Sequence, residues 1–264
     1  MNAPRNAVPD QFISPHARIG TGNRLGHGVI IDAGVAIGDN NVIRNYAVLT
    51  GRTEIGDGNH IGSHVTLGEV PTHARDKFEF AEQDPTGSPR LIRIGNGNVI
   101  REYSEVGMPT GTLTEIKNDC YISTHCHIPH DSLLEDGVIM SNHSSPGGHN
   151  TVLAGANFGK AVQTHPRIVV GQYTMLGIGS VVIHNVLPGT TVVGNPARVH
   201  GVNRIGLERN GFDESEINEF ADIVETQRAE LLNPESYSPR VAATLQRFLD
   251  ALRGARDDRL LSRP

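Results

Sequence analysis

Aliphatic residues recur at every sixth position from residue 13 to residue 67 without a gap. A period of six fits neither an α-helix, which repeats every 3.6 residues, nor an alternating strand, which repeats every two. It predicts a chain that turns a corner every six residues and points one aliphatic side chain inward from each short strand. Residues 18 apart would then be neighbours in successive coils. The repeat positions are Ile13, Ile19, Leu25, Ile31, Ile37, Ile43, Leu49, Ile55, Ile61 and Leu67.

Two segments interrupt this repeat, which resumes after each of them and continues to Val182. Residues 68–91 contain charges, prolines and aromatic residues, and predict a loop that projects from the coils. Loops on rigid repeat scaffolds often carry binding residues, although a plain surface excursion has the same composition. Residues 107–114 predict a second, shorter loop.

The repeat ends near residue 200, and a helical pattern follows. Asp213 and Glu216 have the spacing of a capping box at a helix start, and Ile217, Phe220, Ala221 and Val224 form one apolar stripe. Ser238 and Pro239 predict the start of a second helix. We expect both helices to pack on the last coils without a catalytic role, and the end of the chain from residue 253 to fray.

These patterns predict a mainly β protein with two domains. Residues 1–200 are expected to form a parallel β-helix of hexapeptide repeats that carries the insertion, and residues 201–264 a C-terminal α-helical domain.

The composition narrows the range of functions. A net charge of -6 gives no general attraction to nucleic acid or anionic membranes, and no secretion signal or membrane span is predicted at residues 1–264. Two cysteines are too few for a disulfide framework. We therefore expect a cytoplasmic protein.

Histidines provide the candidate chemistry, because six of the 13 lie within 41 residues. With 18 residues to a coil, His125 and His143 should stack, and His130 and His149 should lie one coil apart. The spacing predicts an imidazole-lined cleft along one edge of the coils, although each histidine alone could equally be a corner residue bonded to backbone. The six are His125, His127, His130, His143, His149 and His165.

Two chemistries remain open on this spacing. Three convergent imidazoles can hold zinc, and the chain resembles γ-class carbonic anhydrases in its repeat, which would make His125 and His130 metal ligands. Those enzymes are shorter and lack the insertion and the tail. Alternatively, a histidine followed by an aspartate suits a general base supported by a carboxylate.

A closer resemblance covers nearly the whole chain. The sequence HIPHD at residues 127–131, GGH at 147–149 and GNPARVHGVNRIGLERNGF at 194–212 resembles the acyl-carrier-protein-dependent UDP-N-acetylglucosamine O-acyltransferases of lipid A synthesis. The resemblance implies a left-handed β-helix and a homotrimer with sites between subunits. It also implies transfer of a 3-hydroxyacyl chain from acyl carrier protein to the 3-hydroxyl of the nucleotide sugar, without a metal or other cofactor.

The resemblance also assigns roles to individual residues. His130 matches the general base, Asp131 its supporting carboxylate, and Gly148 the amide that stabilises the oxyanion. Residues that match the sugar and nucleotide site are His127, His149, His165, Asn203 and Arg209, together with Asp76 or Asp84 in the insertion.

Several positions depart from the family pattern. Ile205 replaces an acidic residue, Asn210 replaces a second arginine, and the loop GMPTGT at residues 107–112 is shortened. These changes leave open another nucleotide-linked sugar, acylated at oxygen or at an amine. Ile178 matches the position that limits the length of the acyl chain in the family. A bulky residue there implies a shorter chain, of about ten carbons, because each methylene that can no longer be buried removes about 0.8 kcal/mol of binding.

Overall fold

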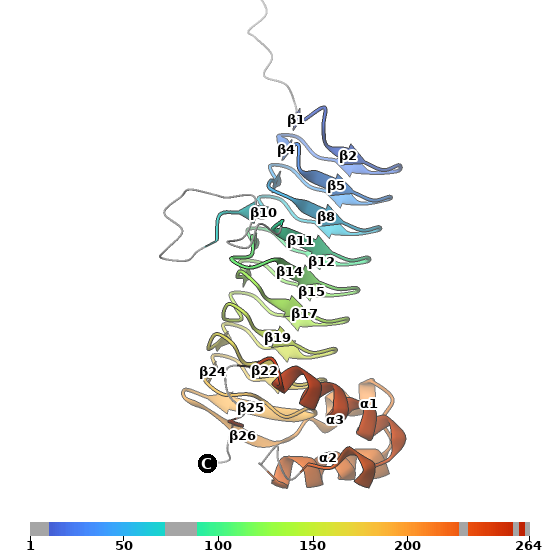
Figure 1. Cartoon of the computed structure of the whole chain (residues 1–264), viewed down its shortest axis with the longest axis vertical. Coiled ribbons are helices and arrows are strands. Elements are labelled where there is room, and N and C mark those ends of the chain that lie inside the picture. The colour runs from blue at the N-terminus through green and yellow to red at the C-terminus, as the bar shows by residue number, and fades with distance from the viewer. Residues whose placement is uncertain (1–10, 72–88, 227–231, 256–258, 262–264) are drawn as a thin grey trace, which may run out of the picture.

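The structure is a computed structural model that describes residues 11–71, 89–226, 232–255 and 259–261. It is a parallel β-solenoid followed by helices that pack against its last coils (Figure 1). The fold class predicted from the six-residue repeat is confirmed. The left-handed sense of the coil remains an implication of the family resemblance.

The strands of the solenoid lie on three faces, which we call A, B and C. Face A contains β1 (Gln11–Ile13), β4 (Val29–Ile31), β7 (Val48–Leu49), β10 (Thr66–Glu69), β13 (Glu105–Gly107) and β16 (His127–Ile128), and continues through Ser145 to β21 (Gln163–Thr164) and β24 (Val181–Val182). Face B contains β2 (Arg18–Ile19), β5 (Val35–Ile37), β8 (Thr53–Ile55), β11 (Leu91–Ile94), β14 (Leu113–Ile116), β17 (Leu133–Leu134), β19 (Thr151–Val152) and β22 (Val169–Val170). Face C contains β3 (Arg24–Leu25), β6 (Val42–Ile43), β9 (His60–Ile61), β12 (Val99–Ile100), β15 (Tyr121–Ile122), β18 (Ile139–Met140), β20 (Asn157–Phe158), β23 (Met175–Leu176), β25 (Thr190–Gly194) and β26 (Ala197–Val202).

Residues 18 apart pair in register, as predicted. Ile43 lies opposite Ile61 on face C, and Leu134 lies opposite Val152 on face B. Across the first insertion Ile61 pairs with Ile100, so the extra residues leave the stack of coils intact. Both interruptions leave the solenoid between a face A strand and the next face B strand, at the corner that we call edge AB.

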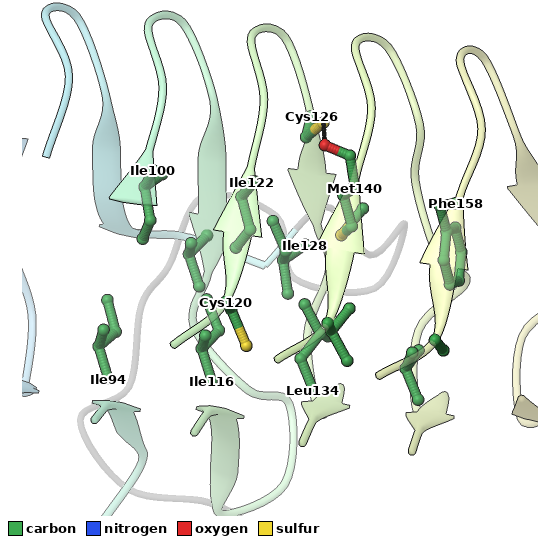
Figure 2. Close-up of a cluster of buried hydrophobic side chains, with 14 of the residues drawn as sticks. Ile94, Ile100, Ile116, Cys120, Ile122, Cys126, Ile128, Leu134, Met140 and Phe158 are labelled. Atoms are coloured by element: carbon green, nitrogen blue, oxygen red, sulfur yellow. Dashed lines mark hydrogen bonds between the residues drawn. The ribbon is translucent and has the colours of Figure 1, made fainter. Parts of the chain in front are cut away.

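The repeat positions form one continuous core. Ile100, Ile122, Met140 and Phe158 follow one another along face C, and Ile94, Ile116 and Leu134 do so along face B (Figure 2). Burial of each such side chain contributes roughly 1.5–3 kcal/mol. Ile13 is an exception, with 38% of its surface exposed, because the first described coil is covered by a neighbouring coil on one side only.

Buried asparagines form a ladder inside the corner between faces B and C. The side-chain amide of Asn41 donates to Oδ1 of Asn23 at 3.1 Å, Asn59 donates to Asn41 at 3.0 Å, and Asn98 donates to Asn59 at 3.0 Å. The ladder satisfies polar groups that would otherwise be costly to bury.

The two predicted helices begin where the sequence patterns place them, as α2 (Glu214–Thr226) and α3 (Pro239–Leu252). The structure adds α1 (Arg204–Arg209) and the 3₁₀ helix η2 (Pro234–Ser236), which the patterns did not predict. The capping box is confirmed, because the Asp213 amide donates to Glu216 and the Glu216 amide donates to Asp213, each at 2.9 Å. The predicted domain boundary after residue 200 falls inside β26. No helix among the described residues has the length and apolar character needed to cross a membrane.

A buried carboxylate fixes α3 to the solenoid. Glu135, only 6% exposed, follows β17 and accepts hydrogen bonds from Arg247 of α3 at 2.6 and 3.0 Å. Lys117, one coil earlier, donates to the same oxygen at 3.1 Å. Ile217 and Phe220 of α2 belong to the same apolar cluster as Leu153 of the solenoid, so the helices share a core with its last coils.

The expectation that the end of the chain frays is wrong for residues 259–261. The Leu261 amide donates to the Asn185 carbonyl at 2.8 Å, and Leu261 is 2% exposed. Asn185 provides a backbone and a side-chain partner inside the last coil, which a reading of the tail alone does not reveal.

Candidate active site

His130 and Asp131 occupy the turn of edge AB that follows β16. Asp131 has a positive φ of 59°, and its amide donates to the Thr114 hydroxyl at 2.9 Å. Nδ1 of His130 lies 2.8 Å from Oδ2 of Asp131, and the two side chains are 13% and 8% exposed. The structure therefore brings together the predicted imidazole and carboxylate in a mostly buried pair.

The loop after β13 completes the surroundings of Asp131. The Thr110 hydroxyl and amide donate to Oδ2 at 2.6 and 3.0 Å, and the Gly111 amide donates to Oδ1 at 2.8 Å. Burial alone would raise the pKa of Asp131, but hydrogen bonds from His130, Thr110 and Gly111 and the charge of His149 hold that pKa well below its usual range. Because an ionised carboxylate only accepts, Nδ1 of His130 donates to it and the ring lone pair is on Nε2.

Gly148 and His149 are the next residues along edge AB. The His149 amide donates to the His130 carbonyl at 3.1 Å, and Nε2 of His149 lies 3.5 Å from Oδ2 of Asp131. A Cβ atom on Gly148 would lie 2.7 Å from Cε1 and Nε2 of His130, so the ring rests directly on the glycine backbone. The Gly148 amide has no hydrogen-bond acceptor among the described residues.

His127 and His165 are the other two histidines assigned to the site. His127 is the first residue of β16 and pairs in register with Glu105. Burial lowers the pKa of His127, which favours the neutral ring, and its buried Nε2 has no hydrogen-bond partner among the described residues. His165 is exposed, with Nδ1 2.9 Å from the Pro166 carbonyl.

The expectation that all six histidines line one edge is wrong. His125 and His143 stack as predicted, with ring centroids 4.9 Å apart, but they occupy the corner between faces C and A. There they continue a ladder of Tyr46, His64 and Tyr103. The cause is the strand β16, which lies between His125 and His130 and carries the chain from one corner to the next.

The zinc hypothesis therefore loses its expected pair of His125 and His130. Within the described chain, the ligand atoms that could converge on one ion belong to His130, Asp131 and His149 and lie within 4.8 Å of one another. Asp131 already accepts hydrogen bonds from Thr110 and Gly111 in this cluster.

Asn203 and Arg209 lie apart from the His130 cluster within one chain. Asn203 caps α1, because its Oδ1 accepts from the Gly206 amide at 3.2 Å, and its Nδ2 donates to the Tyr173 carbonyl at 2.8 Å. Tyr173 is two coils beyond the coil that contains Asp131. Arg209 is exposed in the last turn of α1.

The other predicted site residues can be placed in part. Ile178 follows β23 and is 78% exposed in the single chain. Asp76 and Asp84 lie outside the described residues.

Sequence reasoning missed Thr110, Gly111 and Arg167. Nη2 of Arg167 lies 3.1 Å from Nε2 of His149. His149 is 18 residues, or one coil, before Arg167. Counting 18 residues on from His149 would have found Arg167. The two loop residues carry no such signal, because a loop of irregular length has no period.

Two pockets lie along edge AB. The larger, about 780 Å³, includes Arg18, Arg52 and Met108 and does not include His130. The smaller, about 270 Å³, includes His165 and Arg167 and so adjoins the cluster.

Comparisons with known proteins agree with this architecture. Residues 34–69 match the family model of the bacterial transferase hexapeptide, and residues 185–256 match that of UDP-N-acetylglucosamine O-acyltransferase, domain 2. An acyl-[acyl-carrier-protein]–UDP-N-acetylglucosamine O-acyltransferase of Gloeothece citriformis is 33% identical over 175 residues, which are 66% of this chain and 60% of that protein. The chain thus spans about six-tenths of the length of the curated relatives it matches.

Solved structures extend the likeness over the whole fold. The UDP-N-acetylglucosamine acyltransferase of Bacteroides fragilis has a TM-score of 0.80 at 27% identity, covering 96% of this chain and 98% of that one. The enzyme of Campylobacter jejuni has a TM-score of 0.82 at 21% identity, covering 97% and 99%, which shows the fold. The chain therefore carries the repeat of the bacterial hexapeptide transferases and resembles the UDP-N-acetylglucosamine O-acyltransferases along its length.

Proposed function

We propose that the protein transfers a 3-hydroxyacyl chain from acyl carrier protein to the 3-hydroxyl of UDP-N-acetylglucosamine, the first step of lipid A synthesis. The observation that carries this proposal is the His130 ring, held by Asp131 at 2.8 Å and resting on Gly148. This is the arrangement that a general base beside an oxyanion donor requires.

The chemistry follows from the tautomer of His130. Nε2 takes the proton of the sugar hydroxyl as its oxygen attacks the thioester carbonyl carbon. The carbonyl oxygen becomes negative, and the Gly148 amide donates a hydrogen bond to it. When the carbon–sulfur bond breaks, the carrier's thiolate leaves and receives the proton from the imidazolium, so the base is regenerated. Asp131 stabilises the charged ring and holds its orientation.

The same proposal covers the partners and the remaining site residues. His127, His149 and His165 would contact the sugar and nucleotide, with Asp76 or Asp84 from the insertion. Because Asn203 bonds to Tyr173, two coils beyond the coil of Asp131 in one chain, we propose a homotrimer in which a neighbouring subunit brings Asn203 and Arg209 to the site. Ile178 would limit the acyl chain. We place the reaction in the cytoplasm and assign no metal or other cofactor.

A related acceptor is the second candidate within this class. Position 210, where the family has a second arginine, is an asparagine whose side chain bonds to the Gly206 carbonyl at 2.8 Å. Asn210 offers the nucleotide no second guanidinium. The acceptor could therefore be another nucleotide sugar, acylated at oxygen or at nitrogen.

The test is an assay of the purified protein against several nucleotide sugars with 3-hydroxyacyl-carrier-protein donors, with products identified by mass. His130→Ala should lower turnover by about 10²–10⁴-fold, the usual contribution of a general base. Size-exclusion chromatography with light scattering would give the oligomeric state of the wild-type protein and of His130→Ala.

His143→Ala is the matched control. Because His143 lies at a different corner, this substitution should leave turnover unchanged. Unchanged turnover in His130→Ala would refute the general base. Stoichiometric zinc that turnover requires would favour the metal hypothesis instead, and no turnover with any donor would favour a scaffold.

A further inference from the structure

One ring nitrogen of His149 faces two side chains that require opposite protonation of it. Nε2 of His149 lies 3.1 Å from Nη2 of Arg167 and 3.5 Å from Oδ2 of Asp131. A guanidinium can only donate a hydrogen bond, so it needs a lone pair on this nitrogen, whereas an ionised carboxylate can only accept one and needs a proton there. Nε2 of His149 can therefore satisfy only one of the two at a time.

The geometry favours Arg167. A hydrogen bond between an imidazolium and a carboxylate is usually about 2.7–2.9 Å long, and the contact of His149 with Asp131 is longer than this. Oδ2 of Asp131 already accepts from the His130 ring at 2.8 Å and from the hydroxyl and amide of Thr110 at 2.6 and 3.0 Å. Nε2 of His149 therefore accepts from Arg167, which makes the ring neutral with its proton on Nδ1.

The backbone sets the position of Arg167. Its amide donates to the Gly148 carbonyl at 3.0 Å, one coil earlier in the stack. The next residue, Ile168, is 5% exposed, and its amide donates to the buried Asn150 at 3.0 Å. These bonds hold the backbone of Arg167 beside that of His149, so the exposed guanidinium reaches the imidazole ring.

A charged ring at position 149 would weaken the candidate base. An imidazolium there would donate to Asp131 in competition with His130, and its charge would oppose protonation of the His130 ring, whose centroid is 5.1 Å away. Arg167 opposes that charged state, because its N–H occupies the lone pair that the proton needs and its positive charge repels a second one. We propose that Arg167 is a positioning residue that keeps His149 neutral and so reserves the carboxylate of Asp131 for His130.

Acid reverses this arrangement. Although burial raises the pKa of Asp131, its hydrogen bonds and the charge of a protonated His149 lower that pKa well below its usual range. Once Nε2 of His149 carries a proton, it must leave Arg167. The groups that face His149 include Asp131, which favours its protonation, Arg167, which opposes it, and His130, edge-on to the ring. Arg167 therefore determines how far the pH must fall before His149 changes partner.

The inference deepens the proposed function, on which it rests for the role of His130. Arg167 is not among the residues that the family resemblance assigns. The first test needs no substrate, so its failure can be told apart from a failure of the proposed reaction. It is nuclear magnetic resonance of the ring nitrogens in protein labelled with ¹⁵N-histidine, with the His149 signals identified by their absence in His149→Gln.

At neutral pH the wild type should show His149 as the neutral tautomer with its proton on Nδ1. In Arg167→Met the midpoint for protonation of His149 should rise by about one pH unit, a tenfold change in the proton affinity of the ring. Arg167→Lys keeps a charged donor and should lie between the two. Arg253→Met is the matched control, because Arg253 is 76% exposed and pairs with Asp250, so it should leave His149 unchanged.

The second test is the pH profile of kcat/KM for acyl transfer. Arg167→Met should lower kcat/KM about tenfold on the acid side and approach the wild-type value in alkaline solution, where His149 is neutral in both proteins. A role confined to packing would lower kcat/KM equally at every pH. Circular dichroism should show that the variants are folded.

The inference is overturned if wild-type His149 has its proton on Nε2 or is charged at neutral pH, or if it titrates identically in Arg167→Met. A kcat/KM that falls equally at every pH, or does not fall, would also overturn it. If His149 titrates as expected and no donor supports acyl transfer, the proposed function fails, while Arg167 stands as the residue that keeps His149 neutral.

Discussion

The Thr110 hydroxyl donates a 2.6 Å hydrogen bond to Oδ2 of Asp131, the same oxygen that faces the His130 ring. A residue of the shortened loop thus supports the carboxylate that supports the proposed base. The loop is a part of the candidate site and not only a connection between strands.

Replacing Thr110 by Val removes that donor and keeps the shape of the side chain. We expect kcat to fall about tenfold with little change in KM for the nucleotide sugar, because a hydrogen bond to a charged group contributes about 1.5–3 kcal/mol. Thr110→Ser keeps the hydroxyl and should restore turnover. Steady-state kinetics of the two variants checks this, and equal kcat in wild type and Thr110→Val would contradict it.

Gly148→Ala should place a methyl group against the His130 ring. Because the new Cβ would lie 2.7 Å from the ring, the imidazole must move, and we expect turnover to fall about a hundredfold. Gly254→Ala is the control, since its Cβ would meet the nearest atom at 3.6 Å. Circular dichroism should show both variants folded. A fully active Gly148→Ala protein would show that the ring does not need its present position.

Asp131 should make stability depend on acid. Its pKa in the folded protein is below the unfolded value of about 3.9, so its contribution is present above about pH 4 and is lost as the pH falls through the lower folded pKa. We expect the difference in unfolding free energy between wild type and Asp131→Asn to be largest at neutral pH and to shrink below about pH 4. Urea unfolding over this range measures it, and a constant difference would contradict the prediction.

Glu135→Gln should loosen α3 from the solenoid. The substitution removes the charge that faces Arg247 and Lys117, and we expect the free energy of unfolding to fall by about 2 kcal/mol. Glu54→Gln is the control, because Glu54 is 38% exposed and lies 3.7 Å from an exposed arginine, so its loss should change stability by less than about 0.5 kcal/mol. Urea unfolding compares them, and equal losses would show that α3 is held by its apolar face alone.

Ile178→Gly should lengthen the preferred acyl chain. If Ile178 limits the groove, its removal leaves room for further methylenes, each contributing about 0.8 kcal/mol. We expect the ratio of turnover with donors of about 14 carbons to that with about ten carbons to rise at least about tenfold, with Ile178→Ala in between. A series of carrier-protein donors provides the measurement. An unchanged ratio in both variants would remove Ile178 from this role.

The coil could be predicted from the sequence because its inward positions repeat. Ile31, Ile43 and Leu134 are buried because each is an inward position of the six-residue repeat. The capping box at Asp213 is a local pattern of four residues. Local and periodic interactions leave a trace in the order of residues.

Contacts made by irregular segments leave no such trace. The bonds from Thr110 to Asp131 and from Leu261 to Asn185 depend on where two loops meet in space. The placement of His125 away from His130 was accessible from the repeat, since a strand separates them. The prediction grouped the histidines by their distance along the sequence and did not assign each one to a corner of the coil.

The asparagine ladder passes both interruptions without a break. Asn98 bonds to Asn59 across 39 residues, and the Cys120 amide bonds to Asn98 across 22, in place of the usual 18. The number of residues in a loop at edge AB therefore does not alter the stacking of the coils. Residues can be added to or removed from the loops at this edge while the scaffold that holds His130 keeps its dimensions.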